Sequence, residues 1–327
     1  MDLKNKIILI TNRNINPGQT DISLFGDDLN NLSEAELNIA TAEYKNKNWN
    51  LDLLSDPVKP NYDTPVSKQV FKEIIKQAVT DPKAKDWVFF VHGFNQSLKK
   101  NLDKCREIQK YGVNVAAFSW PSNPGPQELW KKKKEYKKAR KNARRSVLAI
   151  ERTMEKFAGY MEEFSSEDCP INVTLVVHSL GNYLFENFVN SPDFSRETRF
   201  FSNVMLHQAD VDHKHHKAWT EKLSDHVRVY VTINEHDLVL DTSDIVNPDR
   251  LGNTAKNLNG NNVTYMDFTW GIDVGNSHRP WNDPGKKNKA VHSFYDLVFH
   301  SRRGEKAKGW ELNTTKNAYQ LIEQEDF

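Results

Sequence analysis

Short runs of apolar residues alternate along this chain with segments of helical periodicity. The runs lie near residues 6–12, 49–54, 87–92, 113–119, 171–178, 202–208, 227–234 and 262–268. Several are continuous rather than alternating, which is typical of strands that are covered on both faces. The pattern predicts an α/β fold with a mostly parallel sheet of about eight strands and helices on both faces. We expect one domain over residues 1–327.

Helical periodicity is clearest in two segments. Residues 98–110 place Leu98, Leu102 and Ile108 on one face, and a stripe of apolar residues continues from about 127 to 164. The second segment predicts one long helix or two collinear helices. The gap between the predicted strands near 202 and 227 leaves room for only one turn-helix-turn, at residues 214–224. We therefore expect no large cap domain.

The most informative stretch lies where the strand ending near residue 178 gives way to a helical pattern. It reads Val177-His178-Ser179-Leu180-Gly181. A serine at a sharp turn from a buried strand into a helix has the geometry of a nucleophile elbow, usually spelled G-x-S-x-G. Gly181 matches the second glycine, whereas Val177 replaces the first. The alternative is a serine at a strand end with no catalytic role.

A nucleophilic serine needs a base and a carboxylate that orients it, which in this architecture follow in the order Ser, Asp, His. Asp237 comes just after the strand 227–233, and Asp210 is the second choice. Asp237 also has an alternative role as the N-cap of a helix. His292, where a helix begins, is the preferred base, and His278 in the preceding loop is the second choice.

Two backbone N–H groups are candidates for stabilising the oxyanion of an acyl-transfer reaction. One belongs to Leu180, at the start of the helix that follows the elbow. The other belongs to Phe94, because His92-Gly93 follows a run of apolar residues and opens the loop before a helix. The sequence therefore predicts an oxyanion hole formed by Phe94 and Leu180.

Several motifs occur together with the elbow, and in this order along the chain: Thr11-Asn12-Arg13, His92-Gly93-Phe94-Asn95, Trp120-Pro121-Ser122 and His178-Ser179-Leu180-Gly181-Asn182. With these motifs the chain resembles a bacterial family of alpha/beta hydrolases of unknown function, over most of residues 6–300. The resemblance implies the alpha/beta-hydrolase fold and a serine hydrolase, and it implies no particular substrate. Family members often have a small residue at the position of Val177.

The same resemblance bears on the other triad members. A family motif Asp-x-Ala-Leu matches Asp237-Leu238-Val239-Leu240, and a motif Gly-His-Ser-Tyr near the end matches Val291-His292-Ser293-Phe294. The second match favours His292 over His278. We therefore expect a serine hydrolase that cleaves an acyl ester, similar to an esterase or lipase, through an acyl-Ser179 intermediate. The alternative from another class is a catalytically silent hydrolase fold that serves as a binding module.

Composition limits the partners of this protein. Lys and Arg total 45 and Asp and Glu total 44, so no overall charge favours nucleic acid or a membrane. The two cysteines, Cys105 and Cys169, are too few for a disulfide framework, and no apolar stretch resembles a signal peptide or a membrane span. We expect a cytoplasmic protein with reduced cysteines. There is no GxGxxG or Walker sequence, so we expect no nucleotide cofactor.

Two further segments have unusual composition. Residues 130–145 hold ten basic residues against one acidic residue, which indicates either a solvated helix face or a surface that binds an anionic partner, lipid head groups or nucleic acid. The second reading would make the protein a hydrolase that docks on a lipid surface, and the first is the simpler one. Residues 207–216 gather four histidines and two aspartates, but their spacing matches no familiar metal site, so we expect no bound metal.

Overall fold

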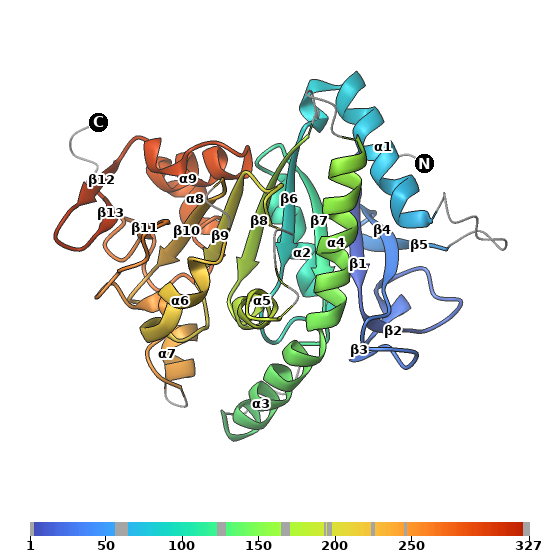
Figure 1. Ribbon diagram of the computed structural model, residues 1–327, viewed down its shortest axis with the longest axis horizontal. Helices are drawn as coiled ribbons and strands as arrows, with labels where there is room; N and C mark the ends of the chain where they lie inside the picture. The colour runs from blue at the N-terminus through green and yellow to red at the C-terminus, as the bar shows by residue number, and fades with distance from the viewer. Residues whose placement is uncertain are drawn as a thin grey trace.

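The computed structural model describes residues 3–55, 65–122, 129–164, 171–192, 194, 198–223, 226–244 and 247–322 (Figure 1). The side chains of residues 129–132, 242 and 244 lie outside this description, as does Cys169. Cys105 is a buried free thiol. Among the described helices, none is long and apolar enough to cross a membrane.

An eleven-stranded sheet runs through the molecule in the order β12-β13-β11-β10-β9-β8-β6-β7-β1-β4-β5. Its strands are β1 Ile7–Thr11, β4 Asn38–Lys45, β5 Asn48–Leu54, β6 Asp86–Val91, β7 Asn114–Ser119, β8 Asn172–His178, β9 Asn203–His207, β10 Arg228–Ile233, β11 Val263–Asp267, β12 Trp310–Asn313 and β13 Ala318–Leu321. Eight neighbouring strands, from β13 to β1, are parallel, and β4, β5 and β12 are antiparallel to their neighbours. A separate ribbon pairs β2 Arg13–Ile15 with β3 Phe25–Leu29.

The predicted mostly parallel, helix-covered sheet is confirmed, but the number of strands is larger than expected. All eight predicted strands are present, and three further strands lie near the two ends of the sheet: β4 between β1 and the edge strand β5, and β13 and the edge strand β12 at the other end. These three strands are partly exposed and carry polar residues, as in the sequence NIATAEYK of β4. They lack the continuous apolar run of a buried central strand, which is why the hydrophobic pattern did not reveal them.

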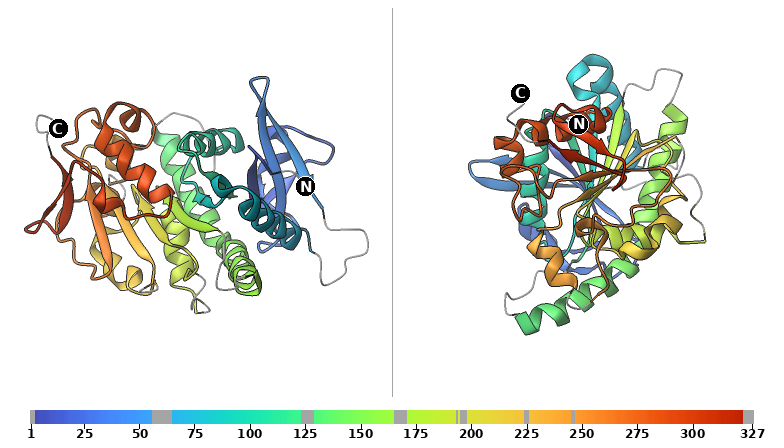
Figure 2. Two further views of the ribbon diagram at one scale, coloured as in Figure 1. Left: turned by 90° about the horizontal axis from the view of Figure 1, so that it is seen from above. Right: turned by 90° about the vertical axis from the view of Figure 1, so that its left-hand side faces the viewer.

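Helices cover both faces of the sheet (Figure 2). They are α1 Val66–Thr80, α2 Leu98–Gln109, α3 Leu129–Arg145, α4 Val147–Phe164, α5 Gly181–Val189, α6 His216–Thr220, α7 Leu238–Asp244, α8 Asp283–Lys287 and α9 Lys289–Phe299. The predicted long helix is two helices, α3 and α4, which are separated at Ser146. The connection between β9 and β10 holds α6 and a short 3-10 turn, His213–His215, in the place of a cap domain.

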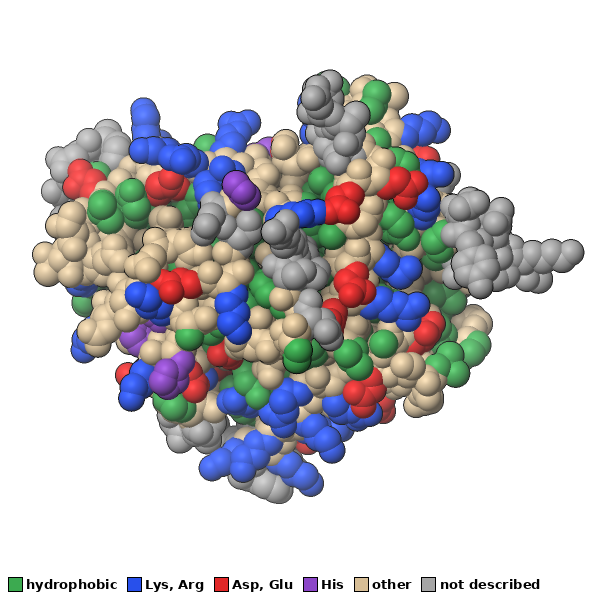
Figure 3. Space-filling view, viewed as in Figure 1, with side chains coloured by type: hydrophobic (Ala, Val, Ile, Leu, Met, Phe, Trp, Pro, Cys, Tyr) green, Lys and Arg blue, Asp and Glu red, His purple; other side chains and the backbone are tan. Residues whose placement is uncertain are grey.

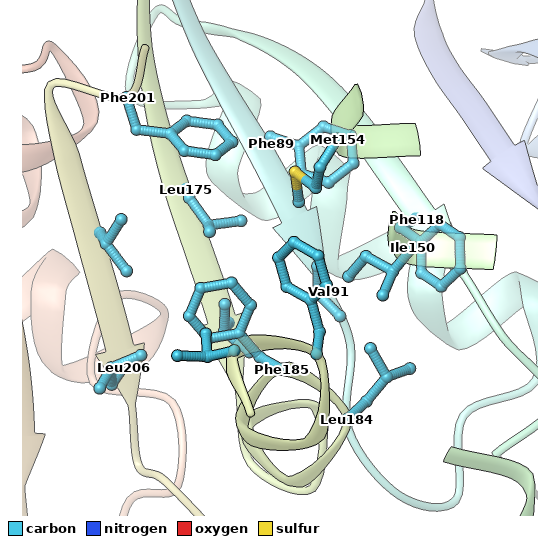
Figure 4. Close-up of a cluster of buried hydrophobic side chains, with 14 of the residues drawn as sticks. Phe89, Val91, Phe118, Ile150, Met154, Leu175, Leu184, Phe185, Phe201 and Leu206 are labelled. Atoms are coloured by element: carbon cyan, nitrogen blue, oxygen red, sulfur yellow. The ribbon is translucent and has the colours of Figure 1, made fainter. Parts of the chain in front are cut away.

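Apolar side chains fill both spaces between the sheet and the helices. On one face Phe89 and Leu175 of the central strands pack with Phe185 of α5 and Met154 of α4 (Figure 4). On the other face the packing is between central strands and the helices α2 and α9. All these residues are almost completely buried, and this burial supplies most of the driving force for folding.

The two central strands β6 and β8 are neighbours in the sheet, although β7 and the three helices α2, α3 and α4 lie between them in the sequence. The chain leaves β6 toward β7 on one side and returns to β8 on the other side. Such a reversal leaves a crevice at the carboxyl ends of the two strands, where ligands bind in open α/β sheets. The Gly93 loop follows β6 and Ser179 follows β8, so both predicted site segments lie at this crevice.

Candidate active site

Ser179 lies in the sharp turn between β8 and α5. Its φ of +54° is in the left-handed region, which a serine rarely adopts. The turn is fixed by neighbouring strand ends, since the N–H of Ser179 donates to His207 O at 2.9 Å and its carbonyl accepts from Asp210 N at 3.2 Å. This is the strained geometry of a nucleophile elbow. The side chain faces a cleft, and its hydroxyl has no hydrogen-bond partner among the described residues.

Two glycines allow the close packing that the elbow requires. A Cβ on Gly181 would lie 2.7 Å from His92 O, and a Cβ on Gly93 would lie 2.6 Å from the Cβ of Ser179. The loop after β6 therefore approaches the elbow through Gly93. Val177 is fully buried in β8 and pairs with Val91 and Leu206, so the elbow forms with a β-branched residue at this position.

The predicted oxyanion donors lie beside each other at this contact. A Cβ on Gly93 would lie 3.0 Å from the N atom of Leu180, which brings the Gly93-Phe94 segment next to the start of α5. Within the residues that the structure describes, the N–H groups of Phe94 and Leu180 have no hydrogen-bond acceptor. Two adjacent unpaired N–H groups at a helix N-terminus are suited to binding a developing negative charge.

His92 and Trp120 hold the Gly93 loop in place. Their rings stack with an interplanar angle of 2°, the indole N–H of Trp120 donates to His92 O at 2.8 Å, and the backbone N–H of Trp120 donates to His92 Nε2 at 3.1 Å. The other ring nitrogen, Nδ1, therefore carries the proton and donates to Gly93 O at 3.0 Å. Burial lowers the pKa of His92 well below its usual value, so this histidine is neutral and serves as a brace.

Arg13 is buried behind the same loop and ties three motifs together. Its guanidinium donates to Ser119 Oγ at 3.0 Å, to Trp120 O at 2.8 Å and to Gln96 O at 2.9 Å. It also pairs with Asp27 at 2.8 Å. Burial is the largest influence on this group and lowers the pKa of Arg13 to about 10, so it stays charged at neutral pH. The Thr11-Asn12-Arg13 motif thus supports the Gly93 loop, and it does not line the cleft.

The carboxylate of Asp237 binds His278. The Nδ1 atom of His278 lies 2.5 Å from Asp237 Oδ2. The other oxygen, Oδ1, accepts from the N–H groups of Val239 at 2.9 Å and Leu240 at 3.3 Å, at the start of α7. Asp237 is fully buried, and His278 lines the same cleft as Ser179. The helix-capping role and the histidine-orienting role, which the sequence offered as alternatives, are both fulfilled by one side chain.

The preferred assignment of His292 as the partner of Asp237 is wrong in this structure. His292 is exposed on α9 and stacks on Tyr111, with ring centroids 4.9 Å apart. The buried face of α9 consists of Val291, Phe294, Tyr295 and Val298, which pack against the sheet. A residue next to Val291 points about 100° away from that direction, so His292 turns to solvent. The helical spacing in the sequence already contained this signal.

The loop that carries His278 is anchored on both sides of the histidine. On one side Asn234 Nδ2 donates to Gly275 O at 3.0 Å and to Ser277 O at 3.1 Å. On the other side Trp281 is 2% exposed, and Tyr111 Oη donates to its carbonyl at 2.6 Å. The position of His278 is therefore fixed by residues that lie far apart in the sequence, and no sequence signal pointed to them.

A chain of buried rings lies beneath His278. The ring of His178 packs 4.7 Å from that of His278 and contacts His207, Nδ1 to Nδ1, at 3.1 Å. His207 Nε2 in turn contacts Tyr295 Oη at 2.9 Å. Burial lowers the pKa of both His178 and His207 well below the usual value, so both are neutral near pH 7. These residues support His278 from below, and the sequence analysis did not assign them a role.

Asp210, the second-choice acid, lines the cleft but does not contact the described histidines through a hydrogen bond. Its carboxylate accepts from Ser243 Oγ at 2.7 Å and from Tyr136 Oη at 3.0 Å. Burial raises the pKa of Asp210 above its usual value. The backbone N–H of Asp210 donates to Ser179 O, so Asp210 helps to hold the elbow in place.

The histidine and aspartate residues of segment 207–216 point in different directions. His207 is part of the buried chain described above, and His216 Nε2 contacts Tyr265 Oη at 2.5 Å. Asp212 pairs with Arg250. Across the described residues, no group of three or more His, Cys, Asp or Glu side chains is arranged to hold a metal ion.

A cleft of about 1090 Å³ opens over Ser179 and His278. Its lining is mixed: Phe94 and Tyr136 form an aromatic wall, with ring centroids 5.5 Å apart, and Leu238 and Val239 lie at the rim. Charged side chains from α2 and from the His278 loop line another part, among them Lys104 and Arg279. The cleft is large enough for a small-molecule substrate of ordinary size.

Comparison with known protein families agrees with this architecture. A family model described as "Alpha/beta hydrolase of unknown function (DUF900)" matches residues 67–274. The chain belongs to this family. The matched part of the alpha/beta hydrolase includes the Gly93 loop, Ser179 and Asp237, and it ends before His278. No curated protein and no solved structure matches the chain significantly.

Proposed function

We propose that this alpha/beta hydrolase is a serine hydrolase that cleaves an acyl ester through an acyl-Ser179 intermediate. The observation that carries the proposal is the pairing of Asp237 with His278 at the rim of the cleft into which the strained Ser179 projects. An oriented histidine that lines the same cleft as a serine in this conformation is what acyl transfer requires, since substrate binding can bring the two together. His278 takes the role that the sequence had given to His292.

In the first half-reaction the Ser179 hydroxyl attacks the ester carbonyl carbon while His278 Nε2 accepts its proton. Asp237 keeps the Nδ1–H of His278 in place and stabilises the imidazolium. The carbonyl oxygen becomes an oxyanion, for which the N–H groups of Phe94 and Leu180 are the donors. The C–O bond to the alcohol then breaks, and His278 returns the proton to the leaving alcohol. Water, activated by the same histidine, releases the acid and restores the serine.

The Ser179 hydroxyl has no hydrogen-bond partner among the described residues, which is consistent with this scheme. In enzymes without substrate the nucleophile and the base are often farther apart than in the reacting complex. Rotation about the Cα–Cβ bond of Ser179 can reorient its hydroxyl within the cleft. The backbone on both sides of it is held by His207 and Asp210.

The direct test combines p-nitrophenyl butyrate hydrolysis with labelling by a fluorophosphonate, which reacts with activated serines. We expect the wild type to hydrolyse the ester and to be labelled, and Ser179→Ala to lose about 10⁶-fold in turnover and all labelling. Ser33→Ala, which changes an exposed serine outside the cleft, is the control and should keep both. Labelling of Ser179→Ala equal to that of the wild type would show that another residue is the nucleophile. A wild type that is neither active nor labelled would favour the silent binding module.

A second candidate is a hydrolase that works on the surface of an anionic lipid bilayer, and it rests on the position of α3. Exposed lysines gather on this helix, at the lower edge of the view in Figure 3. Lys133 of α3 also lines the cleft, together with Leu238 and Val239, which are 58% and 54% exposed. A basic helix and exposed apolar residues at a cleft mouth are the two features with which proteins bind such a surface.

A further inference from the structure

Lys104 is an unusual lysine, because it is buried and lines the cleft. It lies on α2 and is 8% exposed. Within the described chain its ammonium group has no hydrogen bond and no ion pair. Burial of a charged group without a partner costs free energy, so such a group is normally paired or kept for a ligand.

Glu107, the carboxylate of the same helix whose charge acts on Lys104, is already engaged by the loop of His278. Glu107 accepts from Arg279 Nη1 at 3.1 and 2.9 Å, from Trp281 Nε1 at 3.4 Å and from Asn282 Nδ2 at 3.3 Å. These donors occupy both oxygens of Glu107, so Glu107 acts on Lys104 through its charge and makes no hydrogen bond to it, while Lys104 lines the cleft. Arg279 adds a second positive charge, directly after His278 in the sequence.

We propose that Lys104 is a specificity-determining residue that binds a carboxylate or phosphate group of the substrate. This inference rests on the proposed ester hydrolysis and adds the chemical class of the substrate. An anionic oxygen in the cleft would accept a charge-assisted hydrogen bond from the Lys104 ammonium, and the buried surroundings strengthen that bond. The catalytic groups and Lys104 share one cleft, so a single substrate can contact both.

The protonation of Lys104 gives the proposal a pH dependence. Burial is the largest influence and lowers the pKa of Lys104 to about 7. The charged or titratable groups that act on it are Arg279, Glu107, Cys105 and Lys100, and Lys104 itself acts on His178, His207 and His92. An anion binds the protonated form, so selectivity for an anionic substrate is expected to fall as the pH rises above about 7, and bound anion raises the pKa again.

The test compares pairs of esters in which only one member carries an anionic group. The first pair, mono-p-nitrophenyl glutarate and p-nitrophenyl valerate, places a carboxylate on the acyl side. The second pair, the butyrate esters of 4-hydroxyphenyl phosphate and of 4-methylphenol, places a phosphate on the alcohol side. We expect the wild type to prefer the anionic member of one pair by about ten- to a hundredfold in kcat/KM, the effect of one hydrogen bond to a charged group.

Lys104→Met and Lys104→Gln should lose this preference, whereas Lys110→Met, which removes an exposed charge at the end of the same helix, should keep it. Equal rates within both pairs for the wild type, or a preference that survives both Lys104 substitutions, would overturn the proposal. Thermal unfolding confirms that the variants are folded. If no ester is hydrolysed and no label is taken up, the proposed function fails. In that case calorimetry measures binding of the anionic and neutral esters to Ser179→Ala, with Lys104 present and with Lys104 replaced. Tighter binding of the anionic ester only when Lys104 is present would support its role.

Discussion

Asp237 binds His278 through one carboxylate oxygen and caps helix α7 through the other. The first contact, 2.5 Å to Nδ1, fixes the imidazole at the cleft. The second, to the N–H groups of Val239 and Leu240, fixes the carboxylate itself. An orienting acid works only if its own position is rigid, and here a helix N-terminus supplies that rigidity. The relationship predicts a variant that loses activity while it stays folded.

Asp237→Asn is expected to reduce ester hydrolysis strongly while leaving the protein folded. The amide oxygen can still cap α7, but the uncharged side chain no longer stabilises the His278 imidazolium, which costs about 10²- to 10⁴-fold in kcat. Hydrolysis of p-nitrophenyl butyrate and the melting temperature are the two measurements. A variant that keeps its full activity would contradict the role of Asp237.

The two histidines should respond differently to substitution. His278→Ala removes the base and is expected to lower turnover by about 10⁴-fold or more, whereas His292→Ala, at an exposed position on α9, should change it less than about threefold. Fluorophosphonate labelling rates give the same comparison without turnover. If His292→Ala were the inactive variant, the geometry around Asp237 would not be that of the working enzyme.

Gly93→Ala is expected to impair the oxyanion hole. Its methyl group would lie 2.6 Å from the Cβ of Ser179, 2.9 Å from His178 O and 3.0 Å from Leu180 N, so the loop has to shift. Losing the alignment of one donor typically costs about 10²- to 10³-fold in kcat, with a smaller effect on KM. Gly159→Ala in α4, where a Cβ meets nothing within 4 Å, is the control and should leave kcat unchanged.

Lys104 makes stability depend on pH in a direction that can be worked out from its pKa. The folded-state pKa of about 7 lies below the ordinary lysine pKa of 10.5, so between these values the unfolded chain binds more protons than the folded one. The free energy of unfolding therefore rises with pH across this window, and the full cost of the buried charge is present below pH 7. We expect Lys104→Met to be more stable than the wild type by about 1–3 kcal/mol at pH 6.

The difference in the free energy of unfolding between Lys104→Met and the wild type should become smaller as the pH approaches 10. At that pH Lys104 of the folded wild type is neutral. Urea unfolding of both proteins at pH 6, 8 and 10 measures it. A constant difference would mean that the Lys104 ammonium is solvated in the folded protein.

The basic helix α3 provides the test of surface binding. Replacing Lys134, Lys137, Lys138 and Lys141 by Gln should lower binding to vesicles rich in phosphatidylserine by up to about 4 kcal/mol, at about 1 kcal/mol for each charge, with no effect on neutral vesicles. These lysines are exposed, whereas Arg140 and Arg145 bind Asn247 and Glu34 and are left in place. Co-sedimentation at two salt concentrations measures the binding.

A second quadruple variant controls for net charge. Lys47, Lys76, Lys306 and Lys308 are also exposed but lie on other elements, so their replacement by Gln should leave vesicle binding as in the wild type. Equal binding by all three proteins would identify the α3 lysines as a solvated helix face.

The sequence by itself determined the central strands and the elbow. Buried parallel strands need continuous apolar runs, and the helix after Ser179 needs a stripe at helical spacing, so both leave strong local patterns. Gly181 and Asp237 could also be found from local patterns, because each follows shortly after the end of a strand. The strands β4, β12 and β13, which lie near the ends of the sheet, leave weaker patterns because each is partly exposed.

Only the tertiary structure decided which histidine meets Asp237. Position along the chain places both His278 and His292 after the last central strand, and the motif match favoured the second. The choice depends on how the loop after β11 folds back, and that is set by Asn234, Glu107 and Tyr111, which lie on other elements. The sequence also could not predict that the charge of Lys104 is unpaired. Burial and the lack of a hydrogen-bond or ion-pair partner are properties of the packed cleft and not of helix α2.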